Sequence, residues 1–190
     1  PMIYAPLRTR ADVAALRVPD PEEELGFVLE AIRLVRTEID GKLPLIGFAG
    51  APFTLASYMI EGRSSRNCLV TKVLMYEEPE IWHLLVDKLA AAISSYLLAQ
   101  SQSGAQALQL FDSWVGCLSP SDYRAYVLPY SRKVFEALHG SGVLLLPRIG
   151  ARVGGLVLEQ HDLLGGVVVA TFDERPLRTD LTRDRLDSLA

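Results

Sequence analysis

The chain has 190 residues, of which 49% are hydrophobic and 22% are charged, and its formal net charge is −4. This composition is ordinary for a globular domain that is long enough to bury a hydrophobic core. The mildly acidic balance argues against nucleic acid or an anionic membrane as the main partner, and no apolar run reaches the roughly 18 residues that a membrane span needs.

The N-terminal residues and the cysteines give indications about processing of the chain and about its cellular compartment. The opening residues, Pro1-Met2-Ile3-Tyr4, lack the basic-then-apolar pattern of a signal peptide. A start on Pro suggests a processed chain or an excerpt. Cys68 and Cys117 are far apart and follow neither disulfide nor zinc spacing. We therefore expect reduced thiols in a cytoplasmic protein.

Two helix starts are expected near the N-terminus. Thr9 can cap a short helix. Asp20, followed by Pro21 and three glutamates, combines a capping residue, a first-position proline and an acidic first turn. Apolar residues then recur at helical spacing as far as Ile39, and the pair at 40–41 ends this helix.

The next stretch is expected to run from a buried strand into a helix. Residues 43–48 form an apolar run, and Gly47 and Gly50 are expected to break the strand or to allow close backbone approach. Pro52 suits the first turn of the following helix. Thr54 and Tyr58 are four residues apart and share a face of that helix. Strand, loop and helix together resemble one wall of a ligand pocket.

Helices and strands alternate through the rest of the chain. The expected elements are a short helix through Met75 and Tyr76, a long helix from Ile81 to Ser103 opened by Glu78-Pro79-Glu80, a strand at 107–111, a helix begun by Ser119-Pro120 and bent at Pro129, a strand at 143–146, a glycine-rich loop at 150–155, a helix at 156–162 and a strand at 167–170. This alternation predicts an α/β fold with a parallel sheet. Nearly pure apolar strands predict that both faces are covered. An open sheet and part of a barrel fit equally well.

Two blocks resemble the uroporphyrinogen decarboxylase family: GFAGAPFTLASYMIEG at 47–62 and LQLFDSWVG at 108–116. The resemblance extends from about Val13 to about Leu146. It implies a (β/α)8 TIM barrel, whose usual length of about 250 residues exceeds that of this chain. Residues 1–190 would then be a single domain forming the central part of a barrel, with the N- and C-terminal parts missing.

The resemblance also implies an activity. The family removes carbon dioxide from the four acetate side chains of uroporphyrinogen III, giving coproporphyrinogen III in haem biosynthesis. It is a lyase that uses neither a metal nor an organic cofactor. The implied partner is therefore a small tetrapyrrole, without nucleic acid or membrane, and the full-length family implies a homodimer.

Four positions match substrate-contacting positions of the family. Tyr58 matches a tyrosine that contacts the substrate, and Ser113 matches a Ser or Thr position. Phe48 and Phe111 match apolar floor positions, although simple core packing explains these two rings as well. Asp112 matches an acidic family position, for which support of the adjoining loop is the safer expectation.

The family's catalytic groups do not match residues of this chain. Its arginine-rich motif and its Asp would lie before Pro1, and its His would lie after Ala190, so we expect this chain alone to be inactive. His83, His139 and His161 share no metal-ligand spacing. The glycine-rich loop at 150–155, with nearby Arg148 and Arg152, fits either an anion cradle or a plain loop.

Two alternatives stay open. A corrinoid-linked methyltransferase would share a similar barrel but would hold zinc through His and Cys late in the chain, where no such set is visible. A truncated, inactive relative would explain the weak resemblance after Leu146.

Overall fold

The computed structural model describes residues 2–39, 42–139 and 141–149. Its helices and strands are α1 (Arg10–Ala15), α2 (Pro21–Glu24), α3 (Gly26–Ile39), β1 (Ile46–Gly50), α4 (Pro52–Glu61), α5 (Leu69–Glu77), α6 (Pro79–Gln102), β2 (Ala107–Asp112), α7 (Pro120–Asp122), α8 (Leu128–Leu138) and β3 (Leu144–Ile149). A 3₁₀ turn covers Val115–Cys117, and a π-helical turn covers Tyr123–Val127. The elements expected at 150–155, 156–162 and 167–170 lie outside the described residues.

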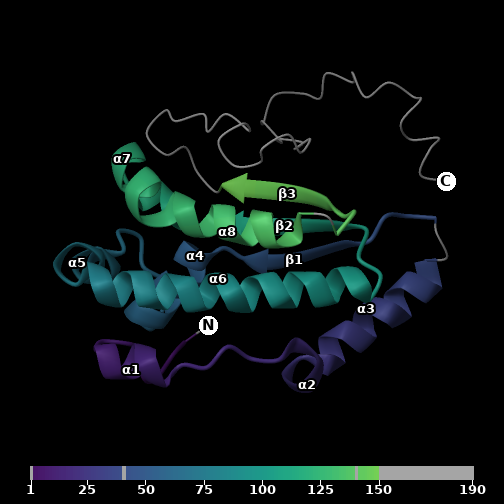
Figure 1. The fold of residues 1–190 in the computed structure, drawn as a ribbon, viewed down its shortest axis with the longest axis horizontal. Coiled ribbons are helices and arrows are strands. Elements are labelled where there is room, and N and C mark those ends of the chain that lie inside the picture. Colours follow the sequence, from purple (N-terminus) through teal and green to yellow (C-terminus); the bar gives the residue numbers. More distant parts are fainter. Residues whose placement is uncertain (1, 40–41, 140, 150–190) are drawn as a thin grey trace.

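The strands form a parallel sheet in the order β1-β2-β3. Helices separate consecutive strands along the chain, which confirms the predicted alternation and the predicted parallel pairing. The arrowheads of β1 and β3 in Figure 1 point towards the end of the molecule where α4, α5 and α7 lie, and β2 runs parallel to both. The carboxyl ends of β1 and β2 therefore meet the start of α4 and the segment that leads to α7.

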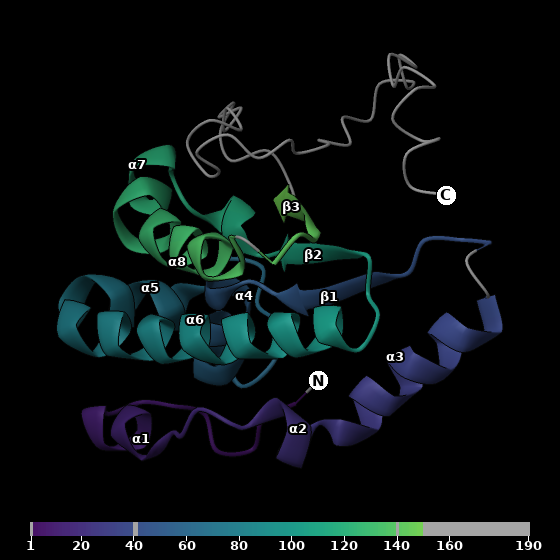
Figure 2. The same ribbon diagram turned by 45° about the vertical axis from the view of Figure 1, so that its right-hand side comes forward.

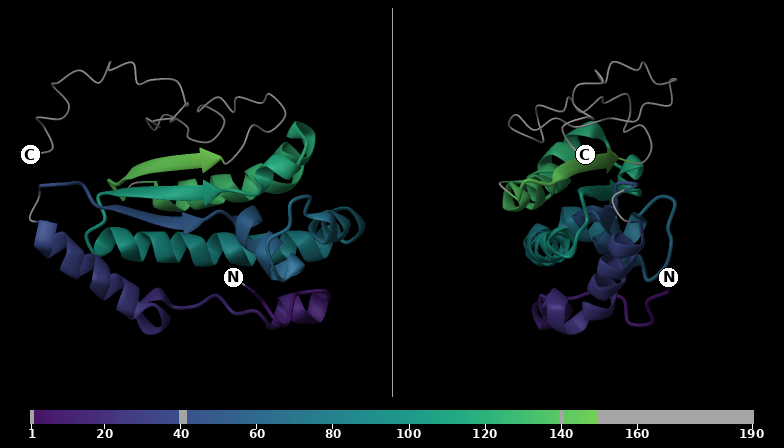
Figure 3. Two further views of the ribbon diagram at one scale, coloured as in Figure 1. Left: turned by 180° about the vertical axis from the view of Figure 1, so that it is seen from behind. Right: turned by 90° about the vertical axis from the view of Figure 1, so that its right-hand side faces the viewer.

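One face of the sheet packs against helices. The long helix α6 contacts α4, α8 and β1, and the strands contribute buried side chains to this layer, namely Ala49, Leu108, Leu110 and Leu145. On the opposite face Ile46, Phe48 and Leu144 are 48%, 62% and 45% exposed. Figure 3 shows this open face in its left-hand view. The prediction of two covered faces is wrong for the described residues, because no described helix packs over these side chains.

The glycines of β1 do not break the strand. Gly47 and Gly50 both lie within β1, which runs from Ile46 rather than from Leu43, and neither has a positive φ. Gly47 instead serves close approach, the other role expected of it, because a Cβ there would lie 2.5 Å from Gln100 Oε1. A left-handed glycine, Gly62 with φ 77°, instead ends α4.

The helix expected from Asp20 to Ile39 is divided in two. Leu25 has φ −122° and ψ 16°, outside the helical region, and separates α2 from α3. Gly26 follows this break, and glycine is a weak helix former. Figure 2 shows α3 leading away from α6, and Leu29 is its buried residue. Its other apolar side chains include three exposed ones, Phe27, Leu34 and Val35.

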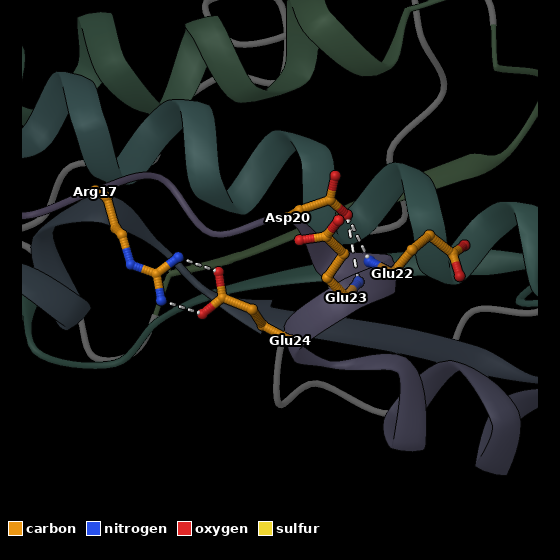
Figure 4. A network of polar contacts seen from close by, with 5 residues as sticks. All are labelled: Arg17, Asp20, Glu22, Glu23 and Glu24. Carbon is orange, nitrogen blue, oxygen red and sulfur yellow. Dashed lines mark hydrogen bonds and ion pairs between the residues drawn. The ribbon is translucent and has the colours of Figure 1, made fainter.

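The polar start of α2 forms as its residues predict. The Asp20 carboxylate accepts hydrogen bonds from the backbone N–H groups of Glu22 and Glu23, at 2.9 and 3.4 Å. Arg17 donates two hydrogen bonds to the Glu24 carboxylate, at 2.6 and 2.8 Å (Figure 4). Arg17 is largely exposed, so this ion pair contributes little to stability.

The helix begun by Ser119 departs from α-helical geometry ahead of Pro129. Leu128 N–H bonds back to the carbonyl of Tyr123, five residues earlier, which defines the π-helical turn. Proline has no N–H to donate to the preceding turn. Trp82 Nε1–H donates to the Tyr126 carbonyl at 3.0 Å, so α6 bonds to a backbone oxygen within this irregular segment.

Among the described residues, α6 is the one helix that is long and apolar enough to cross a membrane. Core helices of globular proteins pass the same test, and nine residues of α6 are buried in this fold. Its length and composition are therefore weak evidence for a span.

Candidate functional site

The carboxyl end of β2 is joined to α4 by a buried hydrogen bond. Thr54 Oγ1 donates to Asp112 Oδ1 at 2.9 Å, and the backbone N–H of Trp114 donates to Thr54 Oγ1 at 3.5 Å. In addition, Ala51 N–H donates to the Phe111 carbonyl at 2.7 Å. These contacts fix the first turn of α4 to the end of β2 and to the loop that follows it.

Asp112 is a buried carboxyl group with an incomplete set of partners. It is 4% exposed, and its Oδ2 has no hydrogen-bond partner among the described residues. Burial raises the pKa of Asp112 to about 7, although the hydrogen bonds from Thr54 act in the opposite direction. A substantial fraction of this group is therefore protonated at neutral pH. Its burial and its bond to Thr54 support the expected role in holding the loop.

Tyr58 lies one turn after Thr54 and contacts the same loop. Its ring packs edge-on against Trp114, with 5.7 Å between ring centroids. Both side chains are partly buried. Thr54, by contrast, is buried against Asp112, so it does not share an open wall with Tyr58 as the helix spacing suggested.

Phe48 and Phe111 come together on the open face of the sheet. Their rings form an edge contact with 5.8 Å between centroids. Phe48 is 62% exposed and Phe111 is partly buried. Core packing on the helix-covered side, the alternative explanation for both rings, does not hold for Phe48.

Gln100, a residue of α6, binds the backbone of Phe48 in β1. Phe48 N–H donates to Gln100 Oε1 at 2.9 Å, and Gln100 Nε2 donates to the Phe48 carbonyl at 3.0 Å. The carboxamide therefore pairs with the outer edge of β1 as a neighbouring strand would. The close approach is possible because residue 47 is a glycine.

Ser113 follows Asp112 directly, at the point where β2 ends, and its side chain is exposed. The structure thus brings Phe48 together with Phe111, and Tyr58 together with Trp114, with Ser113 between Phe111 and Trp114 in the chain.

Sequence reasoning missed three contributors: the pairing of Thr54 with Asp112, the ring of Trp114 against Tyr58, and the carboxamide of Gln100. A polar residue at the end of an apolar strand was a usable indication for Asp112. Gln100 gave no comparable indication, because a glutamine near the end of a helix is ordinary on an exposed surface.

The histidines do not form a site in the described chain. His83 Nδ1 and the Tyr130 hydroxyl lie 2.7 Å apart in a hydrogen bond, His139 is the residue that ends α8, and His161 lies outside the described residues. No three His, Cys, Asp or Glu side chains of the described segments gather as a metal-binding group.

A parallel sheet whose strands alternate with helices along the chain defines an α/β protein. The family model for uroporphyrinogen decarboxylase matches residues 1–173. The chain therefore belongs to the uroporphyrinogen decarboxylase family.

Individual relatives agree with this assignment. Uroporphyrinogen decarboxylase from Syntrophotalea carbinolica is 53% identical over 169 residues, which cover 89% of this chain and 49% of the relative. The enzyme from Thermus thermophilus is 49% identical over 177 residues, which cover 93% of this chain and 51% of the relative. The chain thus spans about half the length of these curated relatives.

A solved structure shares the fold. A methyltransferase from Methanosarcina mazei aligns with a TM-score of 0.63 and 19% identity, over 75% of this chain and 41% of that chain. At this identity the likeness concerns the fold alone.

Proposed function

We propose that this chain is the central part of a uroporphyrinogen decarboxylase, a cofactor-free carboxy-lyase of haem biosynthesis that converts the four acetate side chains of uroporphyrinogen III to methyl groups. The observation that carries the proposal is the family match over residues 1–173. It includes both strand-end blocks, which the structure joins through Thr54 and Asp112.

The fold proposed for the whole protein is a (β/α)8 barrel, of which the described residues supply three parallel strands and their helices. An apolar, uncovered sheet face supports this, because the strands of such a barrel have helices outside and packed side chains inside. Residues 1–190 are then one domain and form about half of the barrel.

In the proposed site the substrate binds at the carboxyl ends of β1 and β2. Phe48 and Phe111 form an apolar floor for the tetrapyrrole, supported by their mutual ring contact and by the exposure of Phe48. The hydroxyls of Tyr58 and Ser113 bind substrate carboxylates without adding charge. Neither is assigned proton transfer, and the chain alone is proposed to be inactive because the family's Arg, Asp and His match no residue here.

The remaining proposals follow from the family. The partner is a small tetrapyrrole rather than nucleic acid or membrane, the full-length protein forms a homodimer, and it works in the cytoplasm. A similar fold is what supports the methyltransferase alternative. The decarboxylase interpretation is supported by relatives in which about half of the residues are identical across most of the chain.

A chimera tests the activity. The 169 residues of this chain that align with the Syntrophotalea carbinolica relative replace its matching segment, and reduced uroporphyrinogen III is the substrate. We expect products that lose carboxyl groups stepwise, whereas the 190-residue chain by itself gives none. Separation of the products by carboxyl number is the measurement.

Two variants of the chimera test the site. Removal of one substrate hydrogen bond in Tyr58→Phe or Ser113→Ala is expected to lower kcat/KM about tenfold or more. The exposed Ser64→Ala is the matched control and leaves the rate unchanged. A folded chimera without turnover would overturn the decarboxylase proposal, and full activity of both site variants would overturn the site.

A further inference from the structure

The two tryptophans of the chain are held in different ways. Trp82 on α6 is 0% exposed, and its Nε1–H donates to the Tyr126 carbonyl at 3.0 Å. Trp114, in the loop after β2, is partly buried and packs both against the core and against the ring of Tyr58. Trp82 therefore serves the packing of the core, whereas Trp114 also has a neighbour in the candidate site.

The backbone of Trp114 is fixed on both sides. Its N–H donates to Thr54 Oγ1 at 3.5 Å, and its carbonyl accepts a hydrogen bond from Cys117 N–H at 3.2 Å. Thr54 is in turn bonded to the buried Asp112, and Val115, the next residue, is 0% exposed. The indole of Trp114 thus projects from a segment that is anchored to α4, to the 3₁₀ turn and to the core.

The orientation of the Tyr58 ring depends on this indole. In the part of the chain that the structure describes, the Tyr58 hydroxyl takes part in no hydrogen bond. The planes of the two rings are inclined by 85°, with 5.7 Å between centroids, which is a favoured arrangement of aromatic pairs. Packing against Trp114, rather than a polar partner, therefore sets the direction of the phenol, and its hydroxyl is left available for a ligand.

We propose that Trp114 is a positioning residue that holds the Tyr58 phenol in the orientation that binds a substrate carboxylate. The proposal rests on the proposed function and adds to it a residue that acts through Tyr58. The rotational freedom of the tyrosine side chain is then lost when the chain folds rather than when the substrate binds. Ser113 precedes Trp114 directly, so the same anchored segment also carries the second proposed hydroxyl.

Kinetics of the chimera test this role. Trp114→Leu keeps the hydroxyls of Tyr58 and Ser113 but removes the ring that orients Tyr58. We expect KM to rise about fivefold, the effect of having to order one side chain on binding, while kcat changes little because Tyr58 is assigned no proton transfer. Trp114→Phe, which keeps an aromatic neighbour, should recover most of the loss.

A double-mutant cycle separates positioning from a general loss of structure. In the Tyr58→Phe background the oriented hydroxyl is already absent, so Trp114→Leu should raise KM by less than about twofold more. Tyr126→Leu is the matched control, because it removes an edge contact of the same kind, with 5.9 Å and 73° between the rings of Tyr76 and Tyr126. This variant should keep the KM of the parent chimera.

The order of the Tyr58 ring is the second measurement, and it does not need activity. The 190-residue chain is labelled with ring-¹³C tyrosine, and the Tyr58 signal is assigned by its loss in Tyr58→Phe. From ¹³C relaxation we expect a ring order parameter near the rigid value of about 0.85, falling below about 0.6 in Trp114→Leu. Tyr126→Leu should leave this value unchanged. Trp114→Met replaces Trp114→Leu in both measurements if the leucine variant does not fold.

The outcomes separate this proposal from the proposed function. An inactive but folded parent chimera would overturn the decarboxylase proposal, and the ring order of Tyr58 would still decide whether Trp114 holds it. In an active chimera, an unchanged KM in Trp114→Leu, or effects of Trp114→Leu and Tyr58→Phe that multiply in full, would overturn the positioning role. An unchanged ring order in Trp114→Leu would do the same.

Discussion

The two faces of the sheet use the same three strands in opposite ways. Residues that point towards α4, α6 and α8, such as Leu108 and Leu110, are buried, whereas Ile46, Phe48 and Leu144 on the other face are 45–62% exposed. Apolar composition is therefore similar on both faces, but burial is not. The difference teaches that an apolar strand sequence does not by itself tell which face of the sheet the described residues cover.

The two faces also hold their residues by different means. On the covered face, packing dominates, and one carboxyl group, Asp112, is buried with a single bond to Thr54. On the open face, Phe48 is fixed through its backbone by Gln100 and through its ring by Phe111. Substitutions on the covered face should therefore act on stability, and those on the open face should act on local order or on ligand contact.

The strongest test compares two phenylalanines. Phe53 on α4 is 0% exposed and contacts Trp82, whereas Phe48 is 62% exposed. Phe53→Ala should lower the free energy of unfolding by about 4 kcal/mol, because a fully packed ring leaves a cavity. Phe48→Ala should cost less than about 1 kcal/mol. Urea unfolding of the 190-residue chain measures both.

The same pair sharpens the comparison in a longer protein. If further strands and helices cover the open face, Phe48→Ala in the full-length chimera should become more costly, while the cost of Phe53→Ala stays the same. A cost above about 2 kcal/mol for Phe48→Ala in the 190-residue chain would show instead that the face is already covered.

Asp112 tests the covered face through pH. Its pKa is about 7 in the fold against an ordinary value of 3.8, so its contribution to stability is fully present below about pH 4 and is lost as the pH rises to about 7. The loss has an upper limit of roughly 4 kcal/mol. Asp112→Asn removes this titration, so the variant should gain stability relative to the wild type over that range.

Denaturant unfolding between pH 4 and 8 measures this difference. Glu30→Gln is the matched control, because Glu30 is 60% exposed in a surface pair with Arg33. This variant keeps Asp112, so its stability should fall with rising pH as that of the wild type does. A wild-type chain that tracks Asp112→Asn at every pH would show that the carboxyl group is not held in a desolvated site.

The sequence predicted local structure more reliably than contacts between distant residues. Thr9, Asp20 and Ser119 cap helices as expected, because a capping side chain bonds to backbone only two or three residues away. The break at Leu25 was missed, since spacing of apolar residues does not report a single non-helical residue.

The prediction of the site shows the same difference between local features and contacts of distant residues. The family resemblance pointed to Phe48, Phe111, Tyr58 and Ser113, and the structure gathers them around the ends of β1 and β2. Their roles towards a substrate stay predictions. The bond from Thr54 to Asp112 spans 58 residues, and that between Gln100 and Phe48 spans 52. Helical or strand periodicity cannot show such pairs, because they depend on how elements pack.

Gln100 tests what protects the outer edge of β1, and the expected effect is smaller than those of Phe53→Ala and Asp112→Asn. Gln100→Leu removes the two hydrogen bonds to Phe48 and should cost about 1–2 kcal/mol. Amide exchange at Phe48 should accelerate about tenfold, whereas Ala51, whose N–H bonds to β2, should keep its protection. Exposed Gln106 accepts one bond from Leu45 N–H at 3.2 Å, so Gln106→Leu is the matched control with a weaker effect. Unchanged exchange at Phe48 in Gln100→Leu would mean that something other than the carboxamide protects this edge of β1.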